Sequence, residues 1–230
     1  MKSYSITGKE LAGSTYEMVW GALENGRSGL IKPDETGCDF LAERDYAKVA
    51  EFFEMEVSKC VPLDDSHYVS LISYNKRYHQ IDADALFSSS TFEEMFKVVT
   101  PVVREELLLL AFVDCVCGNS DRHLGNIAFL SLIDNQVITI CPPYDNVASF
   151  DNSYSNKSLL CPDNTRSWTH RDVFLWLSRN WSKFQYYLGM YESKEFDLLA
   201  DTLHFKNYVL HQRQNLRRYL LWAEMQLSAK

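Results

Sequence analysis

The chain has 230 residues, and its content of 46% hydrophobic and 13% aromatic residues supplies enough apolar material for a core, which argues against a disordered chain. Acidic residues outnumber basic ones by 31 to 23, and the net charge of −8 disfavours the phosphate backbone of nucleic acid as the main partner. No apolar run approaches the roughly 20 residues of a membrane-spanning helix, so no membrane span is expected.

The first part of the sequence predicts short strands joined by turns. Gly, Ser and Thr are frequent in residues 3–33, and residues 24–27 (ENGR) contain the Asn-Gly pair of a tight β-hairpin turn. Apolar residues alternate with other residues before this turn, and Leu30 and Ile31 follow it. We therefore expect a β-hairpin in this region.

The apolar periodicity changes at Phe40. From there to Val57 apolar residues recur broadly at helical spacing, with Glu and Lys between them, which predicts an amphipathic helix. Residues 61–74 return to a composition typical of strands. Residues 75–90 are polar and rich in turn-forming types, which predicts a connection between a front half and a back half.

After Ser90 the sequence predicts mainly helices. Thr91 and Glu94 have the spacing of a capping box at the start of one helix. Pro101 begins a second helix, whose body is so apolar that it must be buried, and Gly118 suits a left-handed cap at its end.

Two strands, at residues 126–133 and 136–142, flank a predicted turn at residues 134–135, and helices alternate with loops from about Ser167 onward. The order of elements is therefore a small mixed sheet with one helix, followed by a larger helical half. It predicts an α+β protein with two lobes and a ligand cleft between them. We expect residues 1–230 to form a single domain. Residues 1–75 would form the first lobe and residues 91–230 the second, with residues 76–90 as the connection between them.

The six cysteines are scattered along the chain and form no Cys-x-x-Cys pair. We see no signal peptide in residues 1–10, and thiols used in this way are typical of a reduced, cytosolic protein. We therefore expect a cytoplasmic location. One residue separates Cys115 from Cys117, which is the wrong spacing for the usual zinc knuckle.

A polar stretch, CGNSDRHLGN at residues 117–126, begins where the buried helix ends. Asp121 and Asn126 lie in this stretch, and Asp145 follows the second of the two strands. A hairpin with Asn126 at one end and Asp145 at the other would bring their oxygen atoms together. Magnesium takes oxygen ligands, and phosphoryl transfer requires a base and two groups that hold the metal. Asp121, Asn126 and Asp145 together therefore meet this minimum requirement, and in the inverted loop described next the Asp would be the base, with Asn126 and Asp145 as metal ligands.

The motif Asp-Arg-His-x-x-Asn resembles the inverted catalytic loop of the HipA-like serine/threonine protein kinases. The same loop occurs in phosphoinositide 3-kinase-like kinases, but the flanks in GNSDRHLGN favour HipA, and Pro142 to Asp145 (PPYD) is similar to its metal-binding motif. The resemblance covers the chain from about Tyr4 to Phe150. It implies a two-lobed protein-kinase-like fold, with a small β-rich N-lobe that contains one helix and a larger, mainly helical C-lobe. It also implies transfer of phosphate from ATP, with Mg²⁺, to a Ser or Thr hydroxyl of a protein.

The resemblance also implies roles for residues that precede the loop. Lys32 looks like the strand lysine that contacts the nucleotide phosphates, and Glu43, on the following helix, looks like the partner that holds this lysine extended. Glu51 and Glu54 on the same helix are alternative partners. In the loop itself, Arg122 and His123 are expected to brace the backbone.

Gly13, Ser14 and Thr15 are similar in placement to the phosphate loop of the HipA family, where small residues let backbone N–H groups approach the phosphate oxygens. Glu17 departs from the pattern, because related sequences tend to carry a Lys shortly after the Gly. Some family members autophosphorylate a serine of this loop, and Ser14 or Thr15 would be the corresponding site.

The chain begins almost at this loop, so it resembles a short form without the extra N-terminal subdomain of full-length HipA. Some family members are toxin arms of toxin–antitoxin pairs, which implies an antitoxin-type regulator as a possible partner. Two alternatives stay open from the sequence. One is a pseudokinase that binds a nucleotide or a partner without turnover, and the other is a lipid or small-molecule kinase that uses the same inverted loop.

Overall fold

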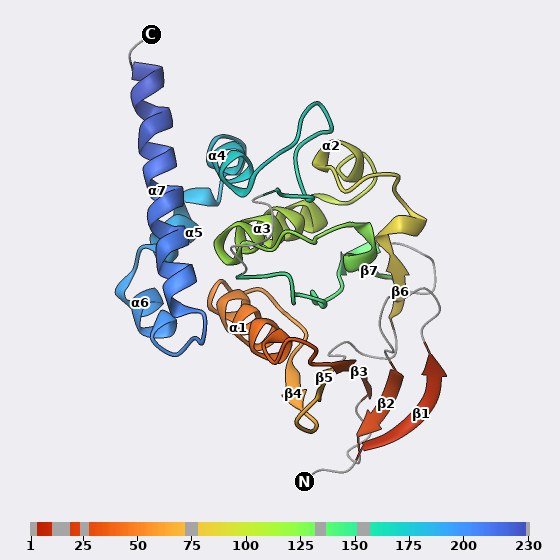
Figure 1. Cartoon of the computed structure of the whole chain (residues 1–230). Helices are drawn as coiled ribbons and strands as arrows, with labels where there is room; N and C mark the ends of the chain where they lie inside the picture. The colour runs from red at the N-terminus through yellow and green to blue at the C-terminus, as the bar shows by residue number, and fades with distance from the viewer. Residues whose placement is uncertain are drawn as a thin grey trace.

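The structure is a computed structural model that describes residues 4–10, 19–23, 28–71, 78–131, 137–150 and 157–228. Five strands near the N-terminus pair in an entirely antiparallel sheet (Figure 1). In spatial order they are β1 (Tyr4–Glu10), β2 (Val19–Leu23), β3 (Ser28–Pro33), β5 (His67–Leu71) and β4 (Cys60–Pro62). The antiparallel pairing of β2 with β3 confirms the strands of the predicted hairpin, whose turn at 24–27 lies outside the described residues.

The helix predicted over residues 40–57 is shorter than expected. The observed helix α1 is Asp39–Phe52, and Glu54 adopts a left-handed conformation with φ 62°. Beyond it Phe53, Met55 and Val57 are buried, whereas the glutamates between them are exposed. This alternation has a period of two, whereas Phe53 and Val57 alone are four residues apart and therefore also fit a continuing helix. The predicted C-terminal end of the helix was therefore wrong.

A second antiparallel sheet lies beside the first and has the order β6 (His79–Asp82), β7 (Ala128–Ser131), β8 (Val137–Ile140). The pair β7–β8 confirms the two strands expected around a turn, although the turn at 134–135 lies outside the described residues. The polar connection predicted at 75–90 contains more structure than expected, namely β6 and a short 3₁₀ helix, η1 (Ala83–Ala85).

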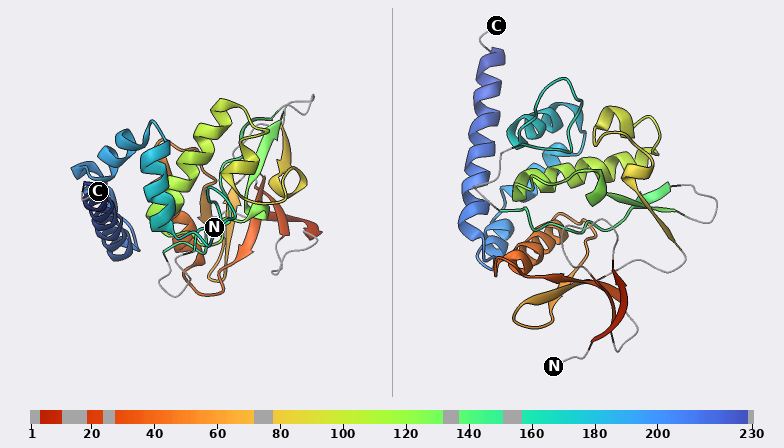
Figure 2. Two further views of the ribbon diagram at one scale, coloured as in Figure 1. Left: turned by 90° about the horizontal axis from the view of Figure 1, so that it is seen from above. Right: turned by 45° about the vertical axis from the view of Figure 1, so that its right-hand side comes forward.

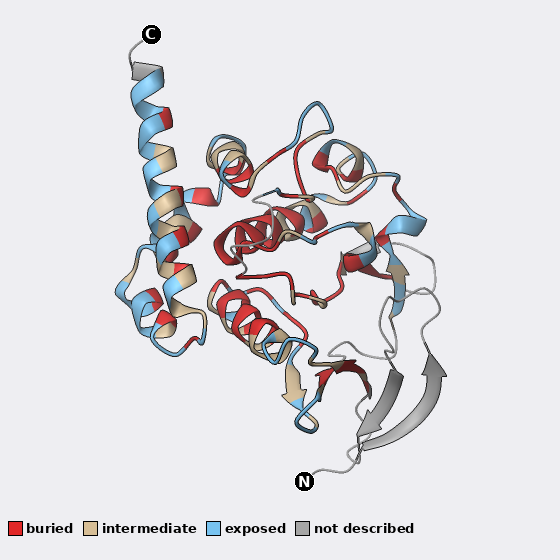
Figure 3. Cartoon of the chain, in the orientation of Figure 1, coloured by how far each residue is buried: buried red, intermediate tan, exposed pale blue. Residues whose placement is uncertain are grey.

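The rest of the chain is mainly helical, as predicted. Its helices are α2 (Phe92–Met95), α3 (Pro101–Cys117), the 3₁₀ helix η2 (Leu124–Asn126), α4 (His170–Asn180), α5 (Phe184–Tyr191), α6 (Lys194–Ala200) and α7 (Lys206–Ser228). Helix α3 lies at the centre and is buried continuously from Leu107 to Cys117 (Figure 3). Helices α1, α4 and α7 pack around it, and the end of α7 projects beyond the body (Figure 2). The predicted order of a small sheet with one helix followed by a helical half is confirmed.

Helix termini follow the sequence signals closely but not completely. Thr91 caps α2 by accepting a hydrogen bond from the Glu94 amide at 3.4 Å. The Glu94 carboxylate does not return to the cap residue, as a full capping box requires, and instead accepts hydrogen bonds from Ser88 and Ser89. Gly118 ends α3 in the left-handed conformation, with φ 66°.

All six cysteines are free thiols, and four of them are buried. The described residues contain no group of three or more His, Cys, Asp or Glu side chains that could hold a metal ion. Among the helices in the described ranges, none combines the length and the apolar character needed to cross a lipid bilayer.

Candidate active site

The polar loop after α3 is fixed at its start by Asn119. The Asn119 side chain accepts a hydrogen bond from the Asp121 amide at 3.1 Å. Its backbone carbonyl accepts one from His170 Nε2 at 2.9 Å, and this histidine is buried at the beginning of α4. Asp121 itself points outward, with 51% of its side chain exposed. The loop therefore presents one accessible carboxylate on an anchored backbone.

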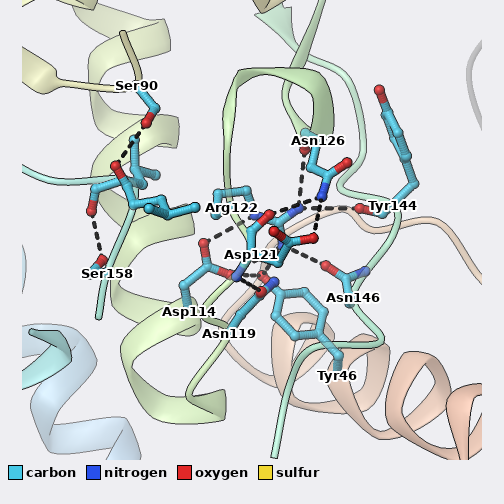
Figure 4. A network of polar contacts seen from close by, with 12 residues as sticks. Tyr46, Ser90, Asp114, Asn119, Asp121, Arg122, Asn126, Tyr144, Asn146 and Ser158 are labelled. Carbon is cyan, nitrogen blue, oxygen red and sulfur yellow. Dashed lines mark hydrogen bonds and ion pairs between the residues drawn. The ribbon is translucent and has the colours of Figure 1, made fainter. Parts of the chain in front are cut away.

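Arg122 is buried and ties together the two segments that carry the predicted metal ligands. Its Nη1 atom donates to the backbone carbonyl of Asn126 at 3.1 Å and to that of Tyr144 at 3.2 Å (Figure 4). Its Nε and Nη2 atoms each lie 3.1 Å from a different carboxylate oxygen of Asp114. Burial acts to lower the pKa of Arg122, but Asp114 and Tyr46 outweigh it and the pKa is raised, so the guanidinium stays charged. The prediction that Arg122 braces the loop is confirmed.

Lys32 on β3 and Glu43 on α1 form a buried ion pair with a separation of 2.7 Å between Nζ and Oε1. The same ammonium group lies 3.1 Å from Asp145 Oδ1. Burial acts to lower the pKa of Lys32, but Glu43 and Asp145 together outweigh this effect and raise the pKa. The lysine therefore remains cationic at neutral pH. The two alternative partners do not contact it, since Glu51 pairs with Lys59, and Glu54 lies beyond the end of α1, is exposed and accepts a hydrogen bond from the Tyr186 hydroxyl at 3.4 Å.

Asn146 connects this ion pair to the loop. Its Nδ2 atom donates to Glu43 Oε2 at 3.1 Å, and its Oδ1 atom accepts a short hydrogen bond from Arg122. Asn146 is fully buried. One continuous polar network therefore runs through the interior and comprises Lys32, Glu43, Asn146, Arg122, Asp114 and Tyr46.

Sequence reasoning missed three members of this network. Asp114 carried a usable signal, because a carboxylate within the apolar run of a buried helix requires a partner. Tyr46 and Asn146 carried no such signal, since their partners lie far away along the chain.

The side-chain orientation of Asn126 and the backbone conformation of Asp145 are both well defined. The amide nitrogen of Asn126 donates to the Asp121 backbone carbonyl at 2.9 Å and to Asp121 Oδ2 at 3.3 Å, which directs the amide oxygen to the opposite side. Asp145 has φ 58°, in the left-handed region that few residues other than glycine adopt and that Asp and Asn tolerate best. Such backbone strain is concentrated at functional sites.

Comparison with solved structures places this arrangement in a known fold. Over 95% of this chain and 93% of the other, the structure is similar to the crystal structure of the Helicobacter pylori proinflammatory kinase CtkA, with a TM-score of 0.68 and 12% identity. It is also similar to HipA of Shewanella oneidensis MR-1, from a toxin–antitoxin complex of HipA, HipB and operator DNA, with a TM-score of 0.56 and 13% identity.

The chain has the fold of the HipA-like kinases. This confirms the predicted two-lobed, kinase-like α+β fold. The alignment spans 94% of this chain but 63% of the HipA chain, which is less than two thirds of its length. No family model and no curated protein matches the sequence.

The donor set at Asn126 and Asp145 fits magnesium. Carboxylate and amide oxygens are the hard ligands that Mg²⁺ prefers, and one or two protein ligands are usual because water and phosphate supply the rest. The Asp145 side chain is 31% exposed, and its Oδ1 faces Lys32, so Oδ2 stays available for a cation. The amide nitrogen of Asn126 is committed to Asp121, so its oxygen is the atom that could bind a cation.

The phosphate loop and His123 are the two remaining parts of the predicted site. Gly13, Ser14, Thr15 and Glu17 fall within residues 11–18, which lie outside the described residues, so the phosphate loop stays a prediction. His123 accepts a hydrogen bond from the Gly125 amide at 3.0 Å, which is a contact within its own loop.

Proposed function

We propose that this chain is an ATP-dependent protein kinase that transfers the γ-phosphoryl group to a Ser or Thr hydroxyl. The observation that carries the proposal is the convergence of Lys32, Glu43 and Asp145 in one ion-pair cluster, which Arg122 and Asn146 join to the loop of Asp121 and Asn126. The HipA-like fold also supports the general activity of a kinase, without specifying the acceptor.

Each polar group has a role that follows from its position. Asp121 is accessible and would orient the acceptor hydroxyl and take its proton. Lys32, held extended by Glu43, would neutralise the oxygens of the α- and β-phosphates. Asn126 and Asp145 would hold magnesium, which supplies charge neutralisation at the phosphates when it is bound. Most of the catalysis would therefore be positioning and charge stabilisation.

Replacement of Asp121 or Asp145 by alanine tests the proposal directly. Removal of a general base lowers turnover roughly 10²- to 10⁴-fold, so we expect Asp121→Ala to abolish measurable transfer of labelled phosphate from ATP. Asp145→Ala should do the same through loss of the metal ligand. Asp201→Ala removes an exposed carboxylate on the surface and should retain wild-type turnover. A folded Asp145→Ala variant, checked by circular dichroism, that turns over like wild type would exclude the metal role.

The same assay separates the proposal from its alternatives. Labelled phosphate in protein rather than in phosphoinositide vesicles distinguishes a protein kinase from a lipid kinase. A rise in melting temperature with ATP and Mg²⁺ but no phosphate transfer to any acceptor would identify a pseudokinase instead.

Two finer points are proposed by analogy. Autophosphorylation at Ser14 or Thr15 would be read by phosphopeptide mapping after incubation with ATP, and the absence of phosphate from both residues would reject it. An antitoxin-type regulator is proposed because the HipA structure comes from a toxin–antitoxin complex with HipB. Co-expression with the product of an adjacent gene, followed by co-purification, tests this partner.

A further inference from the structure

An open groove with a volume of about 850 Å³ adjoins the catalytic loop. One side is formed by residues 123–125 of that loop, another by Asp84 and residues 88–90, and a third by parts of the segment 157–168. Lys32, Glu43 and Asp145 do not line it, so the groove is separate from the predicted nucleotide site. It begins two residues from Asp121, which places it where an acceptor would approach.

The floor of the groove is held by backbone hydrogen bonds. The Phe92 amide donates to the Cys161 carbonyl at 2.8 Å, and the Ser158 amide donates to the Trp168 carbonyl at 2.7 Å. Ser90 Oγ donates to the Leu159 carbonyl at 2.7 Å, and Figure 4 shows Ser90 and Ser158 on either side of this short stretch. A surface fixed in this way is organised before a ligand arrives, which lowers the entropic cost of binding.

Four of the serine hydroxyl groups that line the groove, on residues 88–90 and on Ser158, are already used as donors within the protein. Ser88 and Ser89 both donate to the Glu94 carboxylate, and Ser90 donates to a backbone carbonyl. Besides Asn164, Ser167 and His123, the groove offers charged side chains to a ligand.

Two cations and one acid line the groove. Arg166 stacks its guanidinium on the Trp168 ring at 4.1 Å and is exposed. Its charge is partly offset by Asp172, whose Oδ1 lies 3.5 Å from Arg166 Nη2. Lys157 is exposed and forms no salt bridge with any described residue, and Asp84 is the single carboxylate in the lining. The side chains of the lining therefore carry two positive charges and one negative charge, although Asp163 and Asp172 lie close to Arg166, whereas the whole chain has a net charge of −8.

We propose that this groove binds the protein acceptor and selects segments that carry Asp or Glu beside the phosphorylated Ser or Thr. The proposal rests on the kinase function proposed above and adds the substrate class. Arg166 is suited to carboxylate recognition because its planar guanidinium group stacks on an aromatic ring. Lys157 adds a point charge that no carboxylate of the described residues pairs with.

A positional peptide library tests this selection. Each synthetic peptide carries one central Ser or Thr, and each flanking position is fixed in turn as acidic, basic or alanine. We expect the wild-type protein to phosphorylate peptides with acidic flanks preferentially. Lys157→Glu and Arg166→Glu should each raise KM for acidic peptides roughly three- to tenfold, because a surface attraction becomes a repulsion. Both variants should lower KM for peptides with basic flanks and leave KM for ATP unchanged.

Lys194→Glu is the matched control, because it makes the same charge change at an exposed position on α6 outside the groove, and its peptide preference should equal that of wild type. Peptide phosphorylation without a preference for acidic flanks would overturn the groove proposal and leave the kinase proposal standing. An unchanged preference in both groove variants would overturn it as well. A failure to transfer phosphate to any peptide or to the chain itself would overturn both proposals.

Discussion

Asn146 is the residue whose removal tests the buried network most directly. Its amide makes one hydrogen bond to the Glu43 carboxylate at 3.1 Å and another to the Arg122 guanidinium, and the side chain is fully buried. In Asn146→Ala both bonds disappear, and Glu43 Oε2 loses its partner inside the protein.

A hydrogen bond to a charged group contributes about 1.5 to 3 kcal/mol, so the loss of two such bonds should lower the free energy of unfolding by about 3 kcal/mol or more. Typical domains have an unfolding free energy of about 5 to 15 kcal/mol, so most of the protein should stay folded at neutral pH. Because Glu43 would no longer be aligned by Asn146, KM for ATP should rise as well.

Urea denaturation measures the stability change. The control is Asn180→Ala, which removes the same kind of amide donor from an exposed site where Nδ2 bonds the Trp176 carbonyl at 2.8 Å. This variant should lose no more than about 1 kcal/mol. In a double-mutant cycle, Asn146→Ala and Glu43→Gln should be non-additive by about 1 kcal/mol or more, because the two side chains share a bond. Additive effects, or a loss in Asn146→Ala no larger than that of the control, would refute a connection through Asn146.

Two further predictions concern the start of the polar loop that follows α3. Burial lowers the pKa of His170 below its ordinary value of 6.5, so the unfolded chain takes up the proton first, and wild-type stability should fall as the pH drops below about 6.5. His170→Gln should lack this dependence in urea midpoints measured across the range, and parallel curves would contradict the assignment. Gly118→Ala combines a left-handed φ of 66° with a collision against the Tyr208 hydroxyl, whereas Gly37→Ala has a φ of 70° and no atom within 4 Å. We expect a loss of about 1 kcal/mol in Gly37→Ala and a clearly larger loss in Gly118→Ala by thermal denaturation, and equal losses would exclude the collision.

The parts of the site that the sequence could predict depend on local chain geometry. A buried helix, a glycine cap and two strands joined by a turn are all visible in residue patterns, and together they bring Asn126 and Asp145 to adjacent segments. Lys32 and Glu43 were found because a strand and the next helix stand in the order of a known family. These residues lie together in the structure, while their catalytic roles stay predictions.

The parts that could not be predicted lack a local signal. Strand β6 is mostly exposed, so it has none of the apolar alternation by which strands are recognised. The end of α1 was misplaced because Phe53 and Val57, two buried residues of the extended segment, are four residues apart and so continued the helical spacing. Asn146 follows a motif residue, but its partners are 103 residues away in Glu43 and 24 residues away in Arg122. Only tertiary structure reveals such a connection.

The two oxygens of the Glu43 carboxylate hold α1 in place through two separate hydrogen bonds. One holds Lys32 of the sheet and the other holds Asn146 beside the loop, so the helix cannot swing outward without releasing both. Each release leaves a charged group without its partner in a site that water does not reach, at about 1.5 to 3 kcal/mol apiece. A conformation in which this helix is displaced from the sheet and the loop would therefore be sparsely populated.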